Sequence, residues 1–275
     1  MQNISISPCP NDTFSFYHYL SQLDQEKTQV FFADIQKLNE RALANDGDII
    51  KVSFAVYPLI QEKYIILDSG AALGQGCGPL LISKKKTKAE DIKNLRIAIP
   101  GINTSANRLF RLFFPDHPKC VFTTYEKVLP MVESGEVDAG VIIHENRFTY
   151  QSKGLLLAAD LGEMWAESYG DLLPLGGIVA KRSLGNEKIK LISDSIADSV
   201  QWAFQNKHHI GMRKFIKEHA QELDDEVINQ HIGLYVNEHS VQLGEKGRNA
   251  IKSFLSKELI IDKPCFITEI IDHKN

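Results

Sequence analysis

One pattern of secondary structure occurs twice in this chain and limits the folds open to it. A short strand, a loop rich in capping residues, a helix, a strand, a helix and a third strand are predicted over residues 4–54. The same order returns over residues 96–143, where Gly135–Val137 matches Gly47–Ile49. Each copy is a small α/β unit. The chain is therefore predicted to form two α/β lobes.

Two similar segments bracket the second copy. Gly78–Lys84 and Gly176–Lys181 each run from small residues through four apolar ones to a lysine, and we interpret them as crossover strands. This places the first lobe at 1–83 and 179–275 and the second lobe at 84–178. The C-terminal residues have helical periodicity, and these helices are predicted to return to the first lobe. Two lobes joined by two crossings are predicted to close on a ligand in the cleft between them.

Composition and charge exclude several classes of function. With 31 Lys and Arg against 35 Asp and Glu, the formal net charge is −4, which argues against nucleic acid as a partner. No apolar run approaches the roughly 18 residues that span a bilayer, and residues 1–7 lack the basic segment and apolar core of a signal peptide. The four cysteines have no C-x-x-C spacing, which indicates reduced thiols. We expect a cytoplasmic protein without a membrane partner.

A buried apolar run ends on His144 and Glu145. Ligands of open α/β sheets bind beyond the carboxyl ends of the strands, so His144 lies where chemistry is expected. It could act as a general base whose pKa is tuned by a neighbour such as Glu145. It could equally be a structural residue that ends the strand, and position alone does not choose between the two. No second His or Cys lies at ligand spacing from His144, so no metal site is predicted.

Two loops are predicted at helix N-termini. They consist of Asn11, Asp12 and Thr13 and of Thr104, Ser105 and Ala106. Any of the first three residues can cap the first helix. Free backbone N–H groups and the helix dipole also make such ends suited to carboxylates. Capping alone explains either loop, whereas two loops facing one another across a cleft favour a small anionic ligand.

The third strand of the first copy carries Lys51, Val52 and Ser53 near its end, in the position that corresponds to His144. Lys51 could neutralise an anionic substrate, although a solvated surface lysine is the commoner outcome. The histidines of the helical tail, His231 among them, are interpreted as surface or helix-packing residues. The glycine-rich segment 70–78 precedes a strand and opens no helix, so it is not a dinucleotide fingerprint.

Several motifs taken together resemble one enzyme family. They are Ser7–Phe14, Gly135–Gly140, Ile143–Glu145, Arg147–Tyr150 and Leu173–Gly177. The combination is similar to the 1,4-dihydroxy-6-naphthoate synthases of the futalosine route to menaquinone, and the resemblance covers most of the chain. That family resembles type II periplasmic binding proteins in fold, with two α/β lobes around a ligand cleft, which agrees with the repeat.

The resemblance implies a lyase that converts cyclic dehypoxanthine futalosine to 1,4-dihydroxy-6-naphthoate, with loss of the sugar-derived fragment. It implies His144 as the proton acceptor and substrate contacts in Lys51–Ser53 and Thr104–Ala106. Close relatives often carry His-Thr-Thr where this chain has Asn103–Ser105, so a role for a loop histidine does not carry over. No redox step is required, so no nicotinamide, flavin or metal cofactor is expected.

A carboxylated bicyclic substrate also needs an apolar slot for its ring. The candidates are Phe14, Phe54, Tyr57 and Leu175. Two alternatives stay open, a chorismate-dependent dehydratase of like fold and a non-catalytic solute-binding protein for a small carboxylate. The motifs Ile143–Glu145 and Arg147–Tyr150 favour the naphthoate synthase over the dehydratase. The cysteine pattern and the lack of a signal peptide count against the binding protein. Either a monomer or a homodimer is expected.

Overall fold

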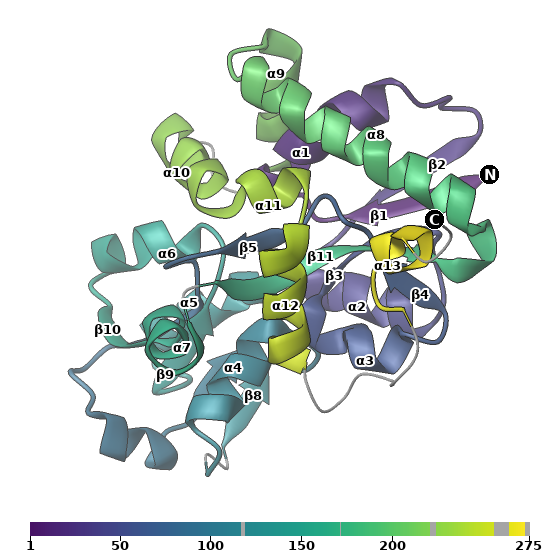
Figure 1. Ribbon diagram of the computed structural model, residues 1–275. Coiled ribbons are helices and arrows are strands. Elements are labelled where there is room, and N and C mark those ends of the chain that lie inside the picture. Colours follow the sequence, from purple (N-terminus) through teal and green to yellow (C-terminus); the bar gives the residue numbers. More distant parts are fainter. Residues whose placement is uncertain (117–118, 171, 221–223, 256–263, 273–275) are drawn as a thin grey trace. The chain divides into compact units, whose positions relative to one another are not determined.

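The computed structural model describes the chain except for residues 117–118, 171, 221–223, 256–263 and 273–275 (Figure 1). The chain divides into two compact units, one made of residues 1–74 and 174–275 and the other of residues 75–173. Each unit contains a β-sheet with helices packed on it. The predicted mixed α/β class is confirmed.

The first unit holds the N-terminal copy of the repeat and the helical C-terminal part. Its strands are β1 (Gln2–Ile6), β2 (Thr28–Phe32), β3 (Ile49–Ser53), β4 (Tyr64–Ile66), β5 (Ala72–Gly74) and β11 (Leu173–Lys181). Its helices are α1 (Pro10–Ser21), α2 (Ile35–Leu43), α3 (Tyr57–Ile60), α8 (Asn186–Gln205), α9 (Ile210–His219), α10 (Asp225–Tyr235), α11 (Glu238–Val241), α12 (Gly244–Leu255) and α13 (Ile267–Asp272).

The second unit holds the other copy. Its strands are β6 (Leu80–Ser83), β7 (Ile97–Ile99), β8 (Cys120–Phe122), β9 (Ala139–Ile142) and β10 (Leu156–Asp160). Its helices are α4 (Ser105–Phe113), α5 (Tyr125–Ser134), α6 (Asn146–Thr149) and α7 (Leu161–Tyr169). The predicted second occurrence of the strand and helix order is therefore present, from β7 to β9.

The two sheets have the same strand order. The first reads β2-β1-β3-β11-β4, with β5 beside β11, and the second reads β8-β7-β9-β6-β10. In each sheet the strands of the repeat are parallel, and the strand beside the third one, β11 or β6, is antiparallel to it. The division expected after residues 83 and 178 puts β6 in the first lobe, whereas β6 lies in the second sheet because it pairs with β9. The likeness of Gly78–Lys84 and Gly176–Lys181 thus reflects equivalent places in two sheets.

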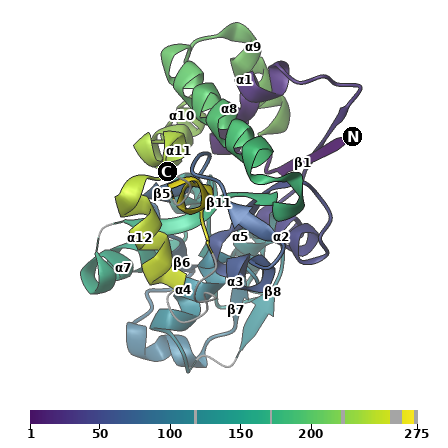
Figure 2. The ribbon, with the colours of Figure 1, turned by 45° about the vertical axis from the view of Figure 1, so that its right-hand side comes forward.

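The helical tail packs on the first unit, as its periodicity predicts. Ile189, Ile192, Ile196 and Val200 form the buried stripe of α8. The first three of these residues join Ile4 and Ile6 of β1 in one hydrophobic core. Helix α8 crosses α1 in both ribbon views (Figures 1 and 2). Burial of this apolar face, at about 25 cal/mol per Å², is what attaches the tail to the sheet.

Local sequence signals mark where helices begin and end. Asp34 caps α2, since its carboxylate accepts from the backbone N–H groups of Gln36 and Lys37. Helix α5 ends at Gly135, whose φ of 81° is in the left-handed region that glycine adopts without strain. The turn predicted at Gly135 therefore delivers the chain into β9.

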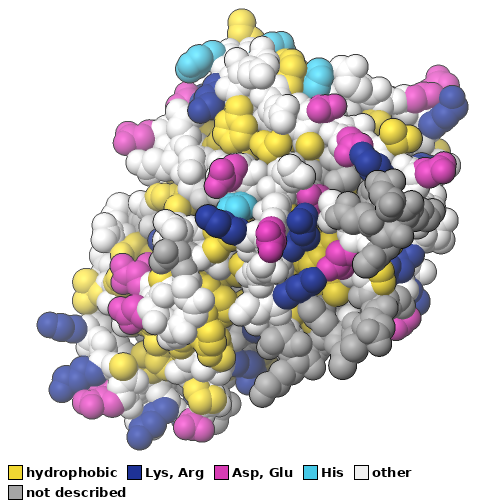
Figure 3. Space-filling view, viewed as in Figure 1, with side chains coloured by type: hydrophobic (Ala, Val, Ile, Leu, Met, Phe, Trp, Pro, Cys, Tyr) yellow, Lys and Arg dark blue, Asp and Glu magenta, His cyan; other side chains and the backbone are white. Residues whose placement is uncertain are grey.

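Charged side chains of both signs lie side by side on the face drawn in Figure 3, where Lys and Arg alternate with Asp and Glu. Such intermixing is typical of a solvated surface. Within the part of the chain that the structure describes, no helix combines the length and the apolar character needed to cross a bilayer.

Candidate active site

His144 lies just beyond the C-terminal end of β9, as predicted. Its φ of 56° is in the left-handed region, which costs a residue other than glycine about 1–2 kcal/mol. The imidazole stands edge-on to the ring of Tyr125 at the start of α5, with centroids 4.9 Å apart and an interplanar angle of 67°. Strained backbone of this kind concentrates at functional sites. The surrounding structure therefore imposes a specific conformation on the candidate base.

The turn after His144 is tied to the short helix α6. The backbone N–H of Arg147 donates to the His144 carbonyl at 3.3 Å, and that of Phe148 donates to the Glu145 carbonyl at 2.9 Å. Glu145 is buried, with 6% of its surface exposed. These bonds fix the backbone on which the His144 side chain is mounted.

Arg147 anchors this turn within the second unit. Its guanidinium donates to the carbonyl oxygens of Gly78 and Gly76, the latter at 2.9 Å, and lies 3.7 Å from the Asp160 carboxylate. Asp160 in turn caps α7 by accepting from two backbone N–H groups. The charge of Arg147 is therefore offset locally, and the side chain works as a structural tether.

Two further residues after His144 belong to the interior of the second unit. Tyr150 packs in its hydrophobic core. Trp165 is 3% exposed, and its indole N–H donates to the Leu172 carbonyl at 3.2 Å. Both side chains thus have structural partners that the sequence does not reveal.

The N-terminus of α4 is formed by the predicted loop. Thr104 is the N-cap, and its hydroxyl accepts from the Asn107 N–H at 3.2 Å and donates to the Gly101 carbonyl at 2.9 Å. Ser105 and Ala106 are the first two helical residues, and both are buried. The predicted cap is confirmed. The backbone N–H groups of this first turn carry the positive end of the helix dipole.

The capping role predicted for the other loop is wrong. Helix α1 begins at Pro10 with Cys9 as N-cap, so Asn11, Asp12 and Thr13 lie inside the first turn. Proline suits this first position because its missing N–H would have no helical partner. The Thr13 hydroxyl donates back to the Cys9 carbonyl at 3.1 Å. The side chains of Asn11 and Asp12 are consequently available for tertiary contacts.

Asp12 and Lys51 form a buried ion pair that joins α1 to β3. The Lys51 ammonium is 2.7 Å from Asp12 Oδ1, and the two side chains are 6% and 2% exposed. Lys51 also donates to the Gly70 carbonyl at 3.1 Å. The other oxygen of Asp12 accepts from the Ser7 hydroxyl at 2.7 Å. Lys51 is therefore not a solvated surface lysine, and its charge has a protein counter-ion.

Val52 and Ser53 end β3. Val52 is fully buried, and alternation along the strand turns its side chain to the face opposite Lys51 and Ser53. The Ser53 hydroxyl accepts from the Asn39 amide at 3.1 Å, and its N–H donates to the Asn39 oxygen at 2.9 Å. Asn39 of α2 thus orients the end of the strand.

His231 is a polar residue of this region that the sequence does not single out. It lies in α10 with no exposed surface, and its Nε2 is 3.0 Å from the Oδ1 of Asn11. It shares the buried face of α10 with Ile228, Ile232 and Tyr235. A histidine in an apolar stripe must find a hydrogen-bond partner, and that requirement is the one signal in the sequence that points to it.

The predicted apolar slot is only partly accessible. Phe54 and Tyr57 are fully buried in the first unit, and the Tyr57 hydroxyl donates to the Cys265 carbonyl at 3.1 Å. Leu175 is partly exposed. Phe54 and Tyr57 are therefore core side chains. Their aromatic character alone does not show whether they pack in a core or line a pocket for a substrate ring.

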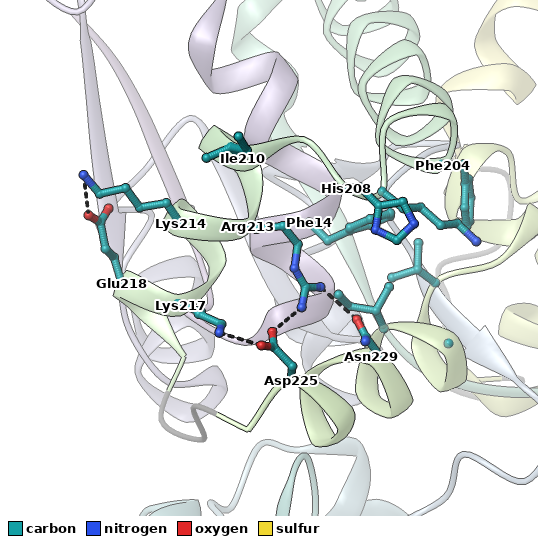
Figure 4. A pocket seen from close by; sticks show the side chains of 14 residues that line it. Phe14, Phe204, His208, Ile210, Arg213, Lys214, Lys217, Glu218, Asp225 and Asn229 are labelled. Atoms are coloured by element: carbon teal, nitrogen blue, oxygen red, sulfur yellow. Dashed lines mark hydrogen bonds and ion pairs between the residues drawn. The ribbon is translucent and has the colours of Figure 1, made fainter.

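A groove of about 1270 Å³ opens in the helical part of the first unit (Figure 4). Phe14 and Phe204 contribute apolar surface to it. Its cationic side chains are largely paired, since Arg213 and Lys217 both donate to Asp225. Phe14 is one of the candidates for the predicted ring slot, whereas none of Asn11–Thr13 and Lys51–Ser53 is among the described residues that line this groove. The groove therefore includes one candidate for the ring slot but none of the predicted polar contacts of its own unit.

The four cysteines are free. Burial raises the pKa of Cys77 to about 12, although the nearby Arg147 opposes the shift. A thiol with such a pKa is not a nucleophile at neutral pH. Within either unit taken alone, the described residues bring no three His, Cys, Asp or Glu side chains within metal-binding reach of one another.

A family described as menaquinone biosynthesis matches residues 2–258. The chain is 40% identical to the 1,4-dihydroxy-6-naphtoate synthase of Streptomyces coelicolor over 261 residues, which cover 92% of this chain and 91% of the relative. It is also 40% identical to the 1,4-dihydroxy-6-naphtoate synthase of Thermus thermophilus over 250 residues, 90% of each chain.

Solved structures support the fold. A crystal structure of a protein from Archaeoglobus fulgidus has a TM-score of 0.85 and 27% identity, covering 98% of this chain and 97% of the other. An alkanesulfonate-binding protein from Xanthomonas axonopodis, bound to MOPS, has a TM-score of 0.65 and 13% identity, covering 98% and 96%. The fold is therefore that of the periplasmic binding proteins.

Proposed function

The chain belongs to the menaquinone biosynthesis family, and we propose that it is the lyase that converts cyclic dehypoxanthine futalosine to 1,4-dihydroxy-6-naphthoate, with loss of the sugar-derived fragment. Two curated relatives that carry the name of this synthase match over 90% or more of the chain. The protein is therefore an enzyme, and the solute-binding alternative rests on a likeness of fold alone.

His144 is the proposed proton acceptor. Formation of an aromatic ring by elimination requires a base at the carbon that loses its proton, and an imidazole titrates near neutral pH. The observation that carries this assignment is the position of His144, just beyond the carboxyl end of β9 in a left-handed backbone conformation. Such a position is where open α/β sheets bind their ligands.

The second unit is also proposed to bind the substrate carboxylate. The first turn of α4, with Thr104, Ser105 and Ala106, presents backbone N–H groups and the positive end of the helix dipole. An anion at this place would satisfy donors that have no partner within a helix. A lysine is not required for this contact.

The first unit is proposed to bind a polar group of the substrate. An ammonium has three N–H donors. Among the residues that the structure describes, Lys51 donates to two acceptors, Asp12 and the Gly70 carbonyl, so one N–H is proposed to donate to a substrate oxygen. The Ser53 hydroxyl, held by Asn39, is a second proposed contact, with Val52 between them on β3. In the first turn of α1, Asp12 accepts from Lys51, Asn11 donates to Asp12, and the Thr13 hydroxyl donates to the Cys9 carbonyl, so these residues are proposed to orient the lysine.

The remaining features of the proposal are the substrate class, the cofactors, the cell compartment and the oligomeric state. The substrate is a small carboxylate, and no nicotinamide, flavin or metal is needed for an elimination. We assign the enzyme to the cytoplasm because its four cysteines are all free. It is proposed to act as a monomer or a homodimer.

The test is turnover by the protein and by His144→Asn. Asparagine tolerates the left-handed backbone of position 144 but cannot act as a base. Each protein is incubated with cyclic dehypoxanthine futalosine, and the dihydroxynaphthoate is followed by chromatography and absorbance. Loss of a general base should lower kcat by about 10²- to 10⁴-fold.

The matched control is His208→Asn, because His208 is an exposed histidine outside the proposed site. It should leave kcat unchanged. Binding of the substrate without turnover by the unmodified protein would favour a solute-binding role. Equal turnover by His144→Asn and the unmodified protein would keep the enzyme and remove His144 from its mechanism.

A further inference from the structure

A chain of buried hydrogen bonds links α10 to β3 through the first turn of α1. His231 Nε2 is 3.0 Å from Asn11 Oδ1. The Asn11 amide nitrogen donates to Asp12 Oδ1 at 2.8 Å, and the same oxygen accepts from Lys51 at 2.7 Å. His231 has no exposed surface, and the other three residues are at most 8% exposed. These four hydrogen-bonded side chains are therefore almost entirely shielded from water.

Only one assignment of donors and acceptors fits this series of hydrogen bonds. The Lys51 ammonium can only donate, so the Asp12 carboxylate accepts from it and from the Ser7 hydroxyl. Asn11 must then present its NH₂ group to Asp12, since its oxygen would repel the carboxylate. The Asn11 oxygen consequently faces α10, and the hydrogen of the contact must reside on His231 Nε2.

We infer that His231 is a positioning residue for the Asp12–Lys51 ion pair: by donating to Asn11 it fixes the amide that holds the Asp12 carboxylate against the ammonium. Its ring also packs on Tyr235, with centroids 4.7 Å apart. An apolar side chain could provide that packing. It could not donate to the Asn11 oxygen, and the Asn11 amide would lose the contact that sets its orientation.

The consequence for catalysis rests on the proposed function, in which Lys51 binds a polar group of the substrate. Misplacement of the Lys51 ammonium should weaken substrate binding while leaving the base His144 untouched. We therefore expect KM to rise by about tenfold, which corresponds to about 1.4 kcal/mol, and kcat to stay within about threefold. A change in kcat of the size expected for loss of a base would not fit a positioning role.

The experiment compares His231→Gln with His231→Leu. The Gln side chain carries an NH₂ group at about the reach of Nε2 and can donate to Asn11, whereas Leu fills space and suits the apolar surroundings. His231→Gln should keep KM within about threefold of the unmodified enzyme. His231→Leu should raise KM about tenfold, although its melting temperature equals or exceeds that of His231→Gln. Ile228→Val, which trims the same face of α10 without altering a hydrogen bond, should leave KM unchanged.

A second readout does not depend on turnover. Nitrogen-15 NMR of the unmodified protein should place the hydrogen of His231 on Nε2, and the Lys51 ammonium signal should move in His231→Leu but not in His231→Gln. A hydrogen on Nδ1 alone, or an ammonium signal that is the same in both variants, would overturn the inference, as would an unchanged KM in His231→Leu. Absence of turnover by the unmodified protein would overturn the proposed function, and the NMR result would then decide the inference by itself.

Discussion

Asp12→Ala should strongly destabilise the first unit, because it leaves the buried ammonium of Lys51 without its counter-ion. The two side chains are 2% and 6% exposed, with their charged atoms 2.7 Å apart. Removing one partner of such a buried pair costs about 3–5 kcal/mol. The exposed pair Lys37–Glu40, at 58% and 48% exposure, should contribute only about 0.3–0.5 kcal/mol. The difference is large against a total stability of about 5–15 kcal/mol.

Urea unfolding followed by circular dichroism measures this difference as a shift of the midpoint at constant slope. Asp12→Ala should lose about 3–5 kcal/mol, and Glu40→Ala about 0.5 kcal/mol or less. The double variant Asp12→Ala/Lys51→Met should be more stable than Asp12→Ala, because it buries no uncompensated charge. A loss for Asp12→Ala no larger than that for Glu40→Ala would refute the reasoning, as would a double variant weaker than the single one.

Three further predictions concern other parts of the chain. Burial acts to raise the pKa of Glu269, but hydrogen bonds from Lys252 and two backbone N–H groups lower it below its ordinary 4.5. Because the folded pKa is depressed, the stability that this carboxylate contributes is full above pH 4.5 and is lost as the pH falls through the folded pKa. In Glu269→Gln the urea midpoint should therefore fall less steeply as the pH is lowered, and a pH dependence of the midpoint equal to that of the unmodified protein would contradict this prediction. Gly140→Ala places a Cβ 2.6 Å from Val128 and should lower stability by about 1–3 kcal/mol, with partial recovery in Gly140→Ala/Val128→Ala by thermal melting. Cys77, with its pKa raised to about 12 by burial, should resist iodoacetamide at pH 8 in the native protein and react in urea, as peptide mass spectrometry would detect.

Much of the fold could be predicted because the signals for it are local. The apolar stripe of α8, from Ile189 to Val200, follows from a period of 3.6 residues and is buried as expected. The Thr104 cap and the turn at Gly135 depend on neighbours a few residues away. The place of His144 after β9 follows from the end of one apolar run. The repeat of strands and helices predicted two α/β lobes, and the structure has two sheets.

Only the tertiary structure decided how the polar side chains of the first unit are used. The sequence allowed Asp12 to be a helix cap and Lys51 to be a surface lysine. In the structure the Lys51 ammonium donates a hydrogen bond to Asp12, which lies 39 positions away in the sequence. His231 looked like a packing residue, and its partner Asn11 is 220 positions away. A buried charge or imidazole needs a partner, but the pattern of residues does not say which distant group supplies it. For Asp12 and Lys51 that choice is made when α1 packs beside β3, and for His231 it is made when α10 of the C-terminal part packs on α1.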